Sequence, residues 1–331
     1  MILVTGGYGC IGAELIKWLL ENTTEKVLLG SRSVSEDRTN RTFYGVPAER
    51  MERLSFVSLD VSKQANVQQV FADFQPTRVA HLGALQTPDC NANRDLGLQV
   101  NLAGTQHILE AAKLADRPLD RFVFASSIAV YGPRASYPDD RVPLTAEPNP
   151  VNAYGVWKLA SEQISKFFAD DTGVPTISLR PGVLYGPGRD LGLTSTPTKA
   201  MKCVALGVPY EIPFCNKQDY LYAPDVGASF AHALMDPFEG YGVFTLPSHT
   251  VEMSAIVAAM QRAADEVGLG DQFQITIGND SVPFICDLEF DAFAKSFPKA
   301  PHTDLETAFR ESLLVFQQQV ARGWLTPANV A

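Results

Sequence analysis

The stretch TGGYGCIG, residues 5–12, decides the fold of this chain. It follows the apolar run Ile2–Val4 and leads into an amphipathic pattern at Ile11–Glu21, so the sequence predicts a strand, a glycine turn and a helix. The first N–H groups of a helix have no intrahelical partner, and the helix dipole is positive at that end. An anion would therefore be stabilised at this turn without any basic side chain.

The spacing of Gly6, Gly9 and Gly12 predicts a dinucleotide site. Such glycines let the chain turn tightly, bring its backbone against a pyrophosphate, and pack the helix closely on the strand. Glycine triplets also mark ordinary turns, and the position between a strand and a helix makes the dinucleotide site the favoured interpretation. The candidate cofactor residues of the turn are Gly6, Gly9, Cys10, Ile11 and Gly12.

Short β-branched or aromatic runs alternate with helical patterns along the first half of the chain. This alternation predicts an α/β fold with a Rossmann-type, doubly wound parallel sheet. Strands are expected at Lys26–Leu29, Leu54–Ser58, Arg78–Leu82, Arg121–Ala125 and Thr176–Arg180, with helices at Ala65–Phe74, Leu96–Ala115 and Ala153–Asp170.

The regular alternation ends after Arg180. We expect a dinucleotide-binding domain at residues 1–180 and a smaller mixed α/β region at 181–331 that binds substrate, with an approximate boundary. The proline-rich segment 133–150 predicts a surface loop. Later helices are expected at Leu193–Gly207, Ser254–Val267 and Leu305–Gly323, and strands at Tyr210–Ile212, Gly242–Leu246 and Gln274–Ile277.

Composition indicates which partners to expect. With 46% hydrophobic residues among 331, the chain can bury a large core. The net charge of −10, without a basic block, argues against nucleic acid or an anionic membrane. A strand expected at Ile2 leaves no room for a signal peptide, and no apolar run is long enough to span a bilayer, so we expect a cytoplasmic protein.

Cysteines and histidines give no metal-binding pattern. The five cysteines are scattered and never spaced as CxxC, which predicts reduced thiols. The five histidines show neither an HExxH motif nor paired spacing, so we expect no metal site.

Tyr154 and Lys158 are four residues apart on a predicted helix and therefore share a face. A phenol with a pKa near 10 is a poor base, and a neighbouring ammonium favours its phenolate form. Ser127, at the end of the preceding strand, could hydrogen-bond the oxygen that exchanges a proton with Tyr154. An exposed Tyr–Lys pair also arises by chance. Because the pair Tyr154 and Lys158 lies downstream of the glycine turn, a hydride-transfer site is the favoured interpretation.

These motifs together resemble the extended short-chain dehydrogenase/reductase family, which includes nucleotide-sugar epimerases and dehydratases. The resemblance covers nearly the whole chain. Its other parts are the acidic dipeptide Asp60-Val61, HLGA at His81–Ala84, VNLAGTQHILEAA at Val100–Ala112, FVFASSIAVYG at Phe122–Gly132, AYGVWK at Ala153–Lys158 and LRPGVLYGPG at Leu179–Gly188.

The resemblance implies a role for each catalytic position. Tyr154 would be the general acid/base, Lys158 would lower its pKa and hold the nicotinamide ribose, and Ser127 would orient the substrate. The further cofactor residues that the resemblance implies are Asp60, Val61, Leu82, Gly83, Ala84, Asn101, Pro181 and Val183. Pro181 could instead simply end a strand, and Asn101 could instead stabilise a helix.

The end of the second strand indicates which dinucleotide is used. NAD enzymes usually place Asp or Glu there, about 20 residues past the glycines, to bind the ribose 2′-hydroxyl. This chain has Ser31 and Arg32, which suit the 2′-phosphate of NADP. NADP is therefore favoured over NAD, although Glu36 or Asp37 would reach the ribose if the strand ended later, and Arg32 could be a solvated loop charge.

The substrate region departs from nucleotide-sugar relatives at Gln218, where they usually carry an arginine that binds the diphosphate. Lys217 could substitute only as a point charge. This favours a smaller sugar, polyol or sugar acid, for which Arg189, Lys199 and Lys202 could supply positive charge. A polar cluster from Thr194 to Thr198 could bind its hydroxyls or a carboxylate, or could equally be the first turn of a helix.

Three functions remain open. The first is an NAD(P)-dependent oxidoreductase that uses free cofactor on a small hydroxylated or carbonyl substrate. The second is a nucleotide-sugar epimerase with tightly bound NAD. The third is a non-catalytic dinucleotide-sensing protein, against which the intact Ser–Tyr–Lys set argues. Dehydration is the least favoured chemistry, because no acidic pair stands beside Ser127.

A homodimer is suggested only by analogy with relatives that pair through the helices at Leu96–Ala115 and Ala153–Asp170. Apolar residues of the second helix, Val156, Leu159, Ile164 and Phe167, could form that interface or could cover the sheet.

Overall fold

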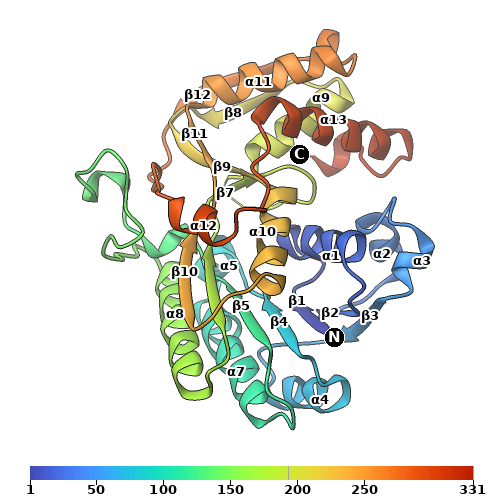
Figure 1. Ribbon diagram of the computed structural model, residues 1–331. Helices are drawn as coiled ribbons and strands as arrows, with labels where there is room; N and C mark the ends of the chain where they lie inside the picture. Colours follow the sequence, from blue (N-terminus) through green and yellow to red (C-terminus); the bar gives the residue numbers. More distant parts are fainter. Residues whose placement is uncertain (193, 331) are drawn as a thin grey trace.

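A seven-stranded parallel sheet forms the centre of the larger part of the molecule (Figure 1). The computed structural model describes residues 1–192 and 194–330. The strands lie in the order β10-β6-β5-β4-β1-β2-β3, and each pairs in parallel with its neighbours. They are β1 (Ile2–Thr5), β2 (Val27–Ser31), β3 (Leu54–Ser58), β4 (Arg78–His81), β5 (Arg121–Ala125), β6 (Thr176–Arg180) and β10 (Tyr241–Thr245).

The strand order reverses between β1 and β4, which are neighbours in the sheet. From β1 the chain continues outward to β2 and β3, and from β4 it continues outward on the other side to β5 and β6. In open α/β sheets, ligands bind outside the carboxyl ends of the strands at such a reversal. The segments that follow these strands therefore meet where a ligand is expected.

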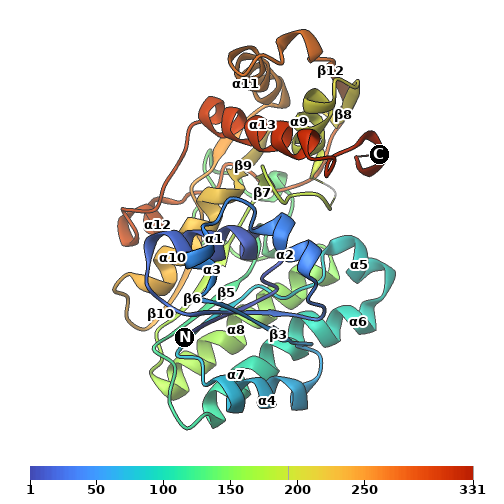
Figure 2. The ribbon, with the colours of Figure 1, turned by 90° about the vertical axis from the view of Figure 1, so that its right-hand side faces the viewer.

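Helices cover both faces of this sheet (Figures 1 and 2). On one face α1 (Cys10–Asn22) packs along α10 (Ala223–Met235). On the other face α7 (Gly104–Leu114) packs against both α4 (Gln64–Phe74) and α8 (Ala153–Thr172). Shorter helices in the connections are α2 (Glu36–Thr42), α3 (Ala48–Met51), α5 (Thr87–Ala92) and α6 (Arg94–Leu98).

Helix α10 was not expected from the sequence. Ten of its 13 residues are buried, so no polar face marks a helical period. It approaches α1 closely, because a Cβ atom at Gly227 would lie 2.6 Å from the carbonyl carbon of Glu14. A helix that is buried on most sides is recognised from its packing and not from its pattern.

The remaining elements form a smaller part, at the top of Figure 1. Its apolar core, which includes Tyr185, Met201 and Phe309, is separate from the core around β1 and α1. One sheet has the order β11-β9-β7, and β12 pairs with β8. The elements are β7 (Val183–Tyr185), α9 (Thr196–Leu206), β8 (Tyr210–Phe214), β9 (Gln218–Tyr222), β11 (His249–Val251), α11 (Met253–Glu266), β12 (Ile275–Asp280) and α13 (Leu305–Ala321). The short helix α12 (Asp291–Ser296) packs instead beside β10, where Phe293 joins the core of the main sheet.

Two expectations need correction. The strand expected at Gly242–Leu246 is β10, which pairs with β6 in the main sheet and not in the smaller region. The helix expected at Leu96–Ala115 consists of α6, a π-helical turn at Gln99–Ala103 and α7. A π turn has i→i+5 bonds and departs from the 3.6-residue period, and the apolar pattern of the sequence did not indicate it. The helix expected at Leu193–Gly207 is α9, and Leu193 lies outside the described residues.

The expected division at residues 1–180 and 181–331 stays a prediction. In the structure, β10 and α10, which belong to the second range, join the main sheet and the helices that cover it. Within the described ranges, we find no helix both long enough and apolar enough to cross a membrane.

Candidate active site

The glycine turn after β1 is held by contacts that leave no space for side chains. Gly6 has a φ of +68°, and a Cβ atom there would lie 3.0 Å from the Cα of Gly83. The Gly9 N–H donates to the Gly6 carbonyl at 2.8 Å. A Cβ atom at Gly12 would lie 2.6 Å from that same oxygen. The turn therefore requires glycine at positions 6 and 12.

The N-terminus of α1 fits an anionic group. Its N-cap is Gly9, which provides no side-chain cap, and no acidic residue lies in its first turn. The thiol of Cys10 donates to the carbonyl of Pro187 at 3.7 Å, and burial raises its pKa to about 12. Cys10 and Ile11 therefore present uncharged side chains and free backbone N–H groups, as a pyrophosphate requires.

The segment after β4 is fixed beside this turn by Thr5. The Thr5 hydroxyl oxygen accepts the N–H groups of Leu82 and Gly83, each at 3.0 Å, and is bonded to His81 Nδ1 at 2.8 Å. Burial, with the charge of Lys158, lowers the pKa of His81 to about 3. The segment Leu82–Ala84 thus lies beside the glycine turn, on a neutral, hydrogen-bonded support.

Asn101 holds the next residue of the same segment. Its Oδ1 accepts the Leu85 N–H at 2.7 Å, and its Nδ2 donates to the Leu85 carbonyl at 2.9 Å. The π-helical turn carries this buried side chain, and such turns are frequent at functional sites. These bonds make Asn101 a positioning residue for the loop after β4.

Asp60 and Val61 follow β3 at the same edge of the sheet. The Asp60 carboxylate accepts the N–H of Ser62 at 3.0 Å and its hydroxyl at 2.7 Å. The Val61 carbonyl accepts from His107 Nδ1 at 2.9 Å when that nitrogen carries the proton. Both residues have intramolecular partners that hold this loop, and their expected cofactor contacts stay predictions.

The end of β2 has no carboxylate. The strand ends at Ser31, Arg32 is exposed, and the first acidic residues, Glu36 and Asp37, lie in the first turn of α2. A second arginine, Arg38, lies near the glycine turn, because its guanidinium carbon is 4.6 Å from the centroid of the Tyr8 ring. Spacing from the glycines did not indicate Arg38, since α2 was not expected.

Tyr154 and Ser127 are brought together by a close approach of α8 to the turn after β5. Tyr154 is in the first turn of α8, and its side chain lies close enough to that of Ser127 for the serine to lower the pKa of the phenol. A Cβ atom at Gly155 would clash with the carbonyl of Ala129, so the glycine after the tyrosine permits this approach. Burial raises the pKa of Tyr154, while Ser127 and Arg189 lower it.

Lys158 lies one helical turn beyond Tyr154. Its ammonium donates to the carbonyl of Ala125 at 2.5 Å and lies 5.6 Å from the centroid of the Tyr154 ring. Burial lowers the pKa of Lys158 to about 8. The sequence led us to expect that Lys158 lowers the pKa of Tyr154, but in this structure burial dominates and the pKa is raised.

A buried ionic network beneath these residues was missed from the sequence. The Arg180 guanidinium donates to both carboxylate oxygens of Glu162, at 2.8 and 2.7 Å, and to the Tyr131 hydroxyl at 2.7 Å. The Ser126 hydroxyl donates to the same carboxylate at 2.5 Å. Glu162 is four residues beyond Lys158 on α8, and this spacing was the available signal.

Pro181 and Val183 follow β6, and both are buried. The carbonyl of Pro181 accepts the Ile128 N–H at 3.1 Å, which joins this segment to the turn that carries Ser127. Their expected place beside the nicotinamide stays a prediction.

Several charged groups expected near the substrate already have partners. Lys217 is ion-paired with Asp287 at 2.8 Å, and Lys202 with Asp190 at 2.5 Å. Gln218 is fully buried, and neither polar atom of its amide has a hydrogen-bond partner. The cluster at 194–198 is the start of α9, with Ser195 as its N-cap and a proline in its first turn.

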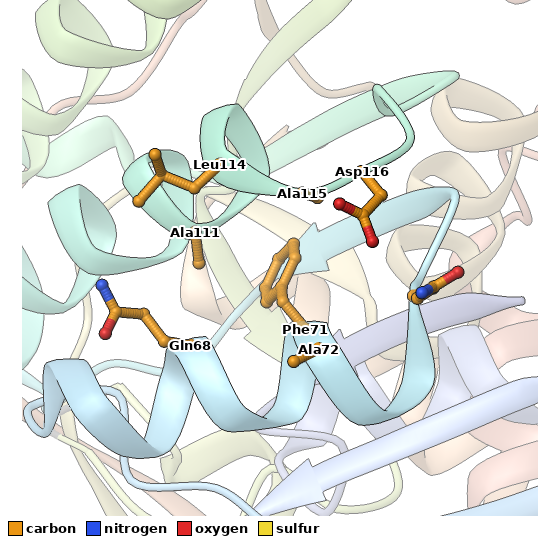
Figure 3. Close-up of a pocket in the computed structure, with 8 residues that line it drawn as sticks. Gln68, Phe71, Ala72, Ala111, Leu114, Ala115 and Asp116 are labelled. Atoms are coloured by element: carbon orange, nitrogen blue, oxygen red, sulfur yellow. The ribbon is translucent and has the colours of Figure 1, made fainter.

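Hollows at the surface of the described residues include the following two. One, of about 520 Å³, lies between the glycine turn, α2 and α13, with Gly9, Cys10, Arg38 and Gln319 in its lining. The other, of about 250 Å³, lies between α4 and α7, where Phe71 points toward α7 (Figure 3). Only the first adjoins the site. Within residues 1–192 and 194–330, no His, Cys, Asp or Glu groups of three or more could hold a metal ion.

Comparison with known families identifies the chain. Residues 2–245 match the model of the NAD dependent epimerase/dehydratase family. The chain belongs to this family. It is therefore an enzyme of an NAD-dependent epimerase, dehydratase and dehydrogenase family, and the non-catalytic alternative is dropped. The fit of the glycine turn and of the α1 N-terminus to a dinucleotide agrees with this membership.

Two relatives illustrate the range of activities. The chain is 30% identical over 203 residues to dTDP-glucose 4,6-dehydratase of Neisseria meningitidis, covering 56% of this chain and 54% of that protein. It is 33% identical over 193 residues to D-erythronate dehydrogenase of Cupriavidus necator, covering 55% and 56%. The chain thus spans about half the length of these relatives.

Solved structures confirm the fold. UDP-glucose 4-epimerase of Thermotoga maritima superposes with a TM-score of 0.79 at 20% identity, over 96% of this chain and 99% of that one. L-threonine dehydrogenase of Clostridium difficile superposes with a TM-score of 0.77 at 21% identity, over 98% of each. Epimerases and dehydrogenases share this fold, so the fold alone does not distinguish the two reactions.

Proposed function

We propose that the protein is an NAD(P)-dependent oxidoreductase that transfers hydride between the nicotinamide and a small hydroxylated or carbonyl substrate. The observation that carries this proposal is the meeting of Ser127, Tyr154 and Lys158 at the carboxyl edge of the sheet that bears the glycine turn. The nicotinamide, when bound, supplies or accepts the hydride.

The proton is handled by the protein. Because burial raises the pKa of Tyr154, its hydroxyl is neutral at neutral pH and can donate to a substrate oxygen. The Ser127 hydroxyl, which lies close to Tyr154, would orient that oxygen. Lys158, with a pKa of about 8, is poised to change its charge near physiological pH and would hold the nicotinamide ribose.

The substrate class is proposed from the pairing of charges. The diphosphate of a nucleotide sugar needs cations to bind it. In this chain position 218 is glutamine, and Lys217 and Lys202 are ion-paired. A sugar, polyol or sugar acid needs fewer positive groups. The resemblance to D-erythronate dehydrogenase of C. necator, a protein named for a sugar acid, supports this class.

For the cofactor we propose a preference for NADP over NAD. Ser31 and the exposed Arg32 end β2 where a carboxylate would bind the ribose of NAD, and Arg38 lies close by against Tyr8. A guanidinium pairs with phosphate through two hydrogen bonds. The family's NAD dependence and the NAD complex of the T. thermophilus UDP-glucose 4-epimerase support the competing candidate, an epimerase with tightly bound NAD.

A homodimer through α7 and α8 is proposed from exposed apolar side chains. Val156 and Phe167 are 48% and 61% exposed on α8, whereas Leu159 and Ile164 are partly buried against the core. We expect Phe167→Glu to halve the mass measured by light scattering, because it places a charge in the interface. Leu191→Glu, at an exposed apolar residue outside α7 and α8, is the control and leaves the mass unchanged. An unchanged Phe167→Glu mass would exclude this interface.

The test of the catalytic proposal is Tyr154→Phe, which removes the proton donor. We expect turnover of the true substrate to fall by roughly 10²- to 10⁴-fold, with cofactor affinity within about twofold of wild type. Tyr210→Phe, in β8 of the smaller part, is the matched control and keeps full activity. Unchanged turnover in Tyr154→Phe would show that another group moves the proton.

A further inference from the structure

Arg189 reaches from the smaller part of the molecule to the dinucleotide side. It follows a turn in which Gly186 and Gly188 have φ values of +110° and +79°. A Cβ atom at Gly188 would lie 3.5 Å from the Cα of Cys10, so this turn packs on the glycine loop. The Arg189 side chain therefore begins beside the helix terminus that would bind a pyrophosphate.

The guanidinium of Arg189 has only neutral partners. Its Nη1 donates to Gln86 Oε1 at 3.5 Å, and its Nη2 donates to Thr194 Oγ1 at 3.3 Å. Its Nε is buried and has no hydrogen-bond partner. The adjacent carboxylate, Asp190, is ion-paired with Lys202 instead. Within the described part of the chain, Arg189 makes no ion pair.

Such an arrangement leaves donors available to an anion. Arg189 is only partly exposed, and a guanidinium offers five N–H donors, of which Arg189 uses two in long bonds. Its charge acts on both sides of the cleft, since it lowers the pKa of Tyr154 and that of Cys10. The guanidinium thus lies within electrostatic range of the proton donor and of the glycine turn.

Several other cations around the site have partners. Lys158 donates to the Ala125 carbonyl, and Lys202 and Lys217 are ion-paired. Arg38 stacks on Tyr8, close to the end of β2. Arg189 is the cation whose charge acts on Tyr154 and whose donors are left unused.

We propose that Arg189 binds an anionic oxygen group, phosphate or carboxylate, that a ligand brings between the glycine turn and Tyr154. This deepens the proposed function, because it adds a specificity-determining residue to the same site. The group has two possible sources, the pyrophosphate of the cofactor and an acidic group of the substrate. The planar guanidinium of Arg189, with its parallel N–H donors, can bind either of these anionic groups.

Binding measurements on Arg189→Gln distinguish the sources. If the anion is the cofactor pyrophosphate, the dissociation constant of the reduced cofactor, followed by its fluorescence, rises about tenfold or more, as expected for a lost charge-assisted hydrogen bond. If the anion belongs to the substrate, that constant stays within about twofold. Inorganic phosphate then raises the melting temperature of the wild-type complex with reduced cofactor, but not that of the variant complex.

Arg189→Lys keeps the charge but loses the planar pair of N–H donors. We therefore expect an intermediate effect in whichever measurement, cofactor affinity or stabilisation by phosphate, changes in Arg189→Gln. Arg141→Gln, an exposed arginine outside the cleft, is the control and should change neither reading. If neither cofactor affinity nor phosphate stabilisation differs between wild type and a folded Arg189→Gln or Arg189→Lys protein, the proposal is wrong. Neither reading requires turnover, so failure of the proposed hydride transfer would be seen separately in Tyr154→Phe.

Discussion

The two sides of the candidate site offer different groups for binding. On the dinucleotide side the proposed binding groups are backbone N–H groups at a glycine turn that provides no side-chain cap. On the substrate side the groups are side chains, and most of the charged ones are already paired, such as Lys202 with Asp190. A backbone site can therefore be recognised from residue types and spacing. A side-chain site depends on which charges are left without partners.

The largest effect is expected at the backbone site. Gly12→Ala would place a Cβ atom 2.6 Å from the Gly6 carbonyl oxygen and 2.9 Å from the Gly7 Cα, both of them backbone. We expect cofactor binding to become undetectable in a fluorescence titration, because the turn must open. Gly240→Ala is the control, since its Cβ meets nothing within 4 Å, and it costs only about 1–2 kcal/mol through its left-handed backbone. Wild-type affinity in Gly12→Ala would contradict this prediction.

A smaller effect is expected in the ionic network under the catalytic residues. Glu162→Gln leaves the buried Arg180 without its carboxylate, and we expect the free energy of unfolding to fall by about 3–5 kcal/mol in urea titrations. On the substrate side, Glu306→Gln breaks an exposed pair with Arg262 and should cost less than about 1 kcal/mol. Equal losses in the two variants would show that burial does not set the value of these pairs.

The last effect is absent at neutral pH and appears only in acid. His81 is buried with a pKa lowered to about 3, so between pH 6.5 and 3 the unfolded chain binds a proton that the folded protein does not. Stability from this group is complete above pH 6.5 and is lost as the pH falls toward 3, by at most about 1.4 kcal/mol per pH unit. We expect His81→Gln to flatten this acid limb of the unfolding free energy. An acid limb as steep as that of wild type would contradict the assignment.

The same contrast explains how far the sequence could be interpreted. The six strands before residue 181 and the convergence of Ser127, Tyr154 and Lys158 were predictable, because apolar patterns and motif spacing are local properties. The Glu162–Arg180 pair and the lone charge of Arg189 were not. Each depends on partners far apart in the sequence, which only packing brings together.

Local patterns also failed where the backbone departs from a regular period or the pattern lacks a polar face. The π turn at Gln99–Ala103 and the largely buried α10 are two such cases. The direction of the Tyr154 pKa was not predictable either, because it depends on the balance of burial against Ser127 and Arg189.

The most direct test of the proposed hydride transfer is to identify the cofactor that the purified protein retains and to titrate the emptied protein with NADP and NAD. We expect exchangeable binding that favours NADP, and a substrate-dependent change in reduced nicotinamide that equals the product formed. NAD that is retained through purification and released only on denaturation, with no net change in reduced nicotinamide during turnover, would contradict the oxidoreductase proposal and favour the epimerase.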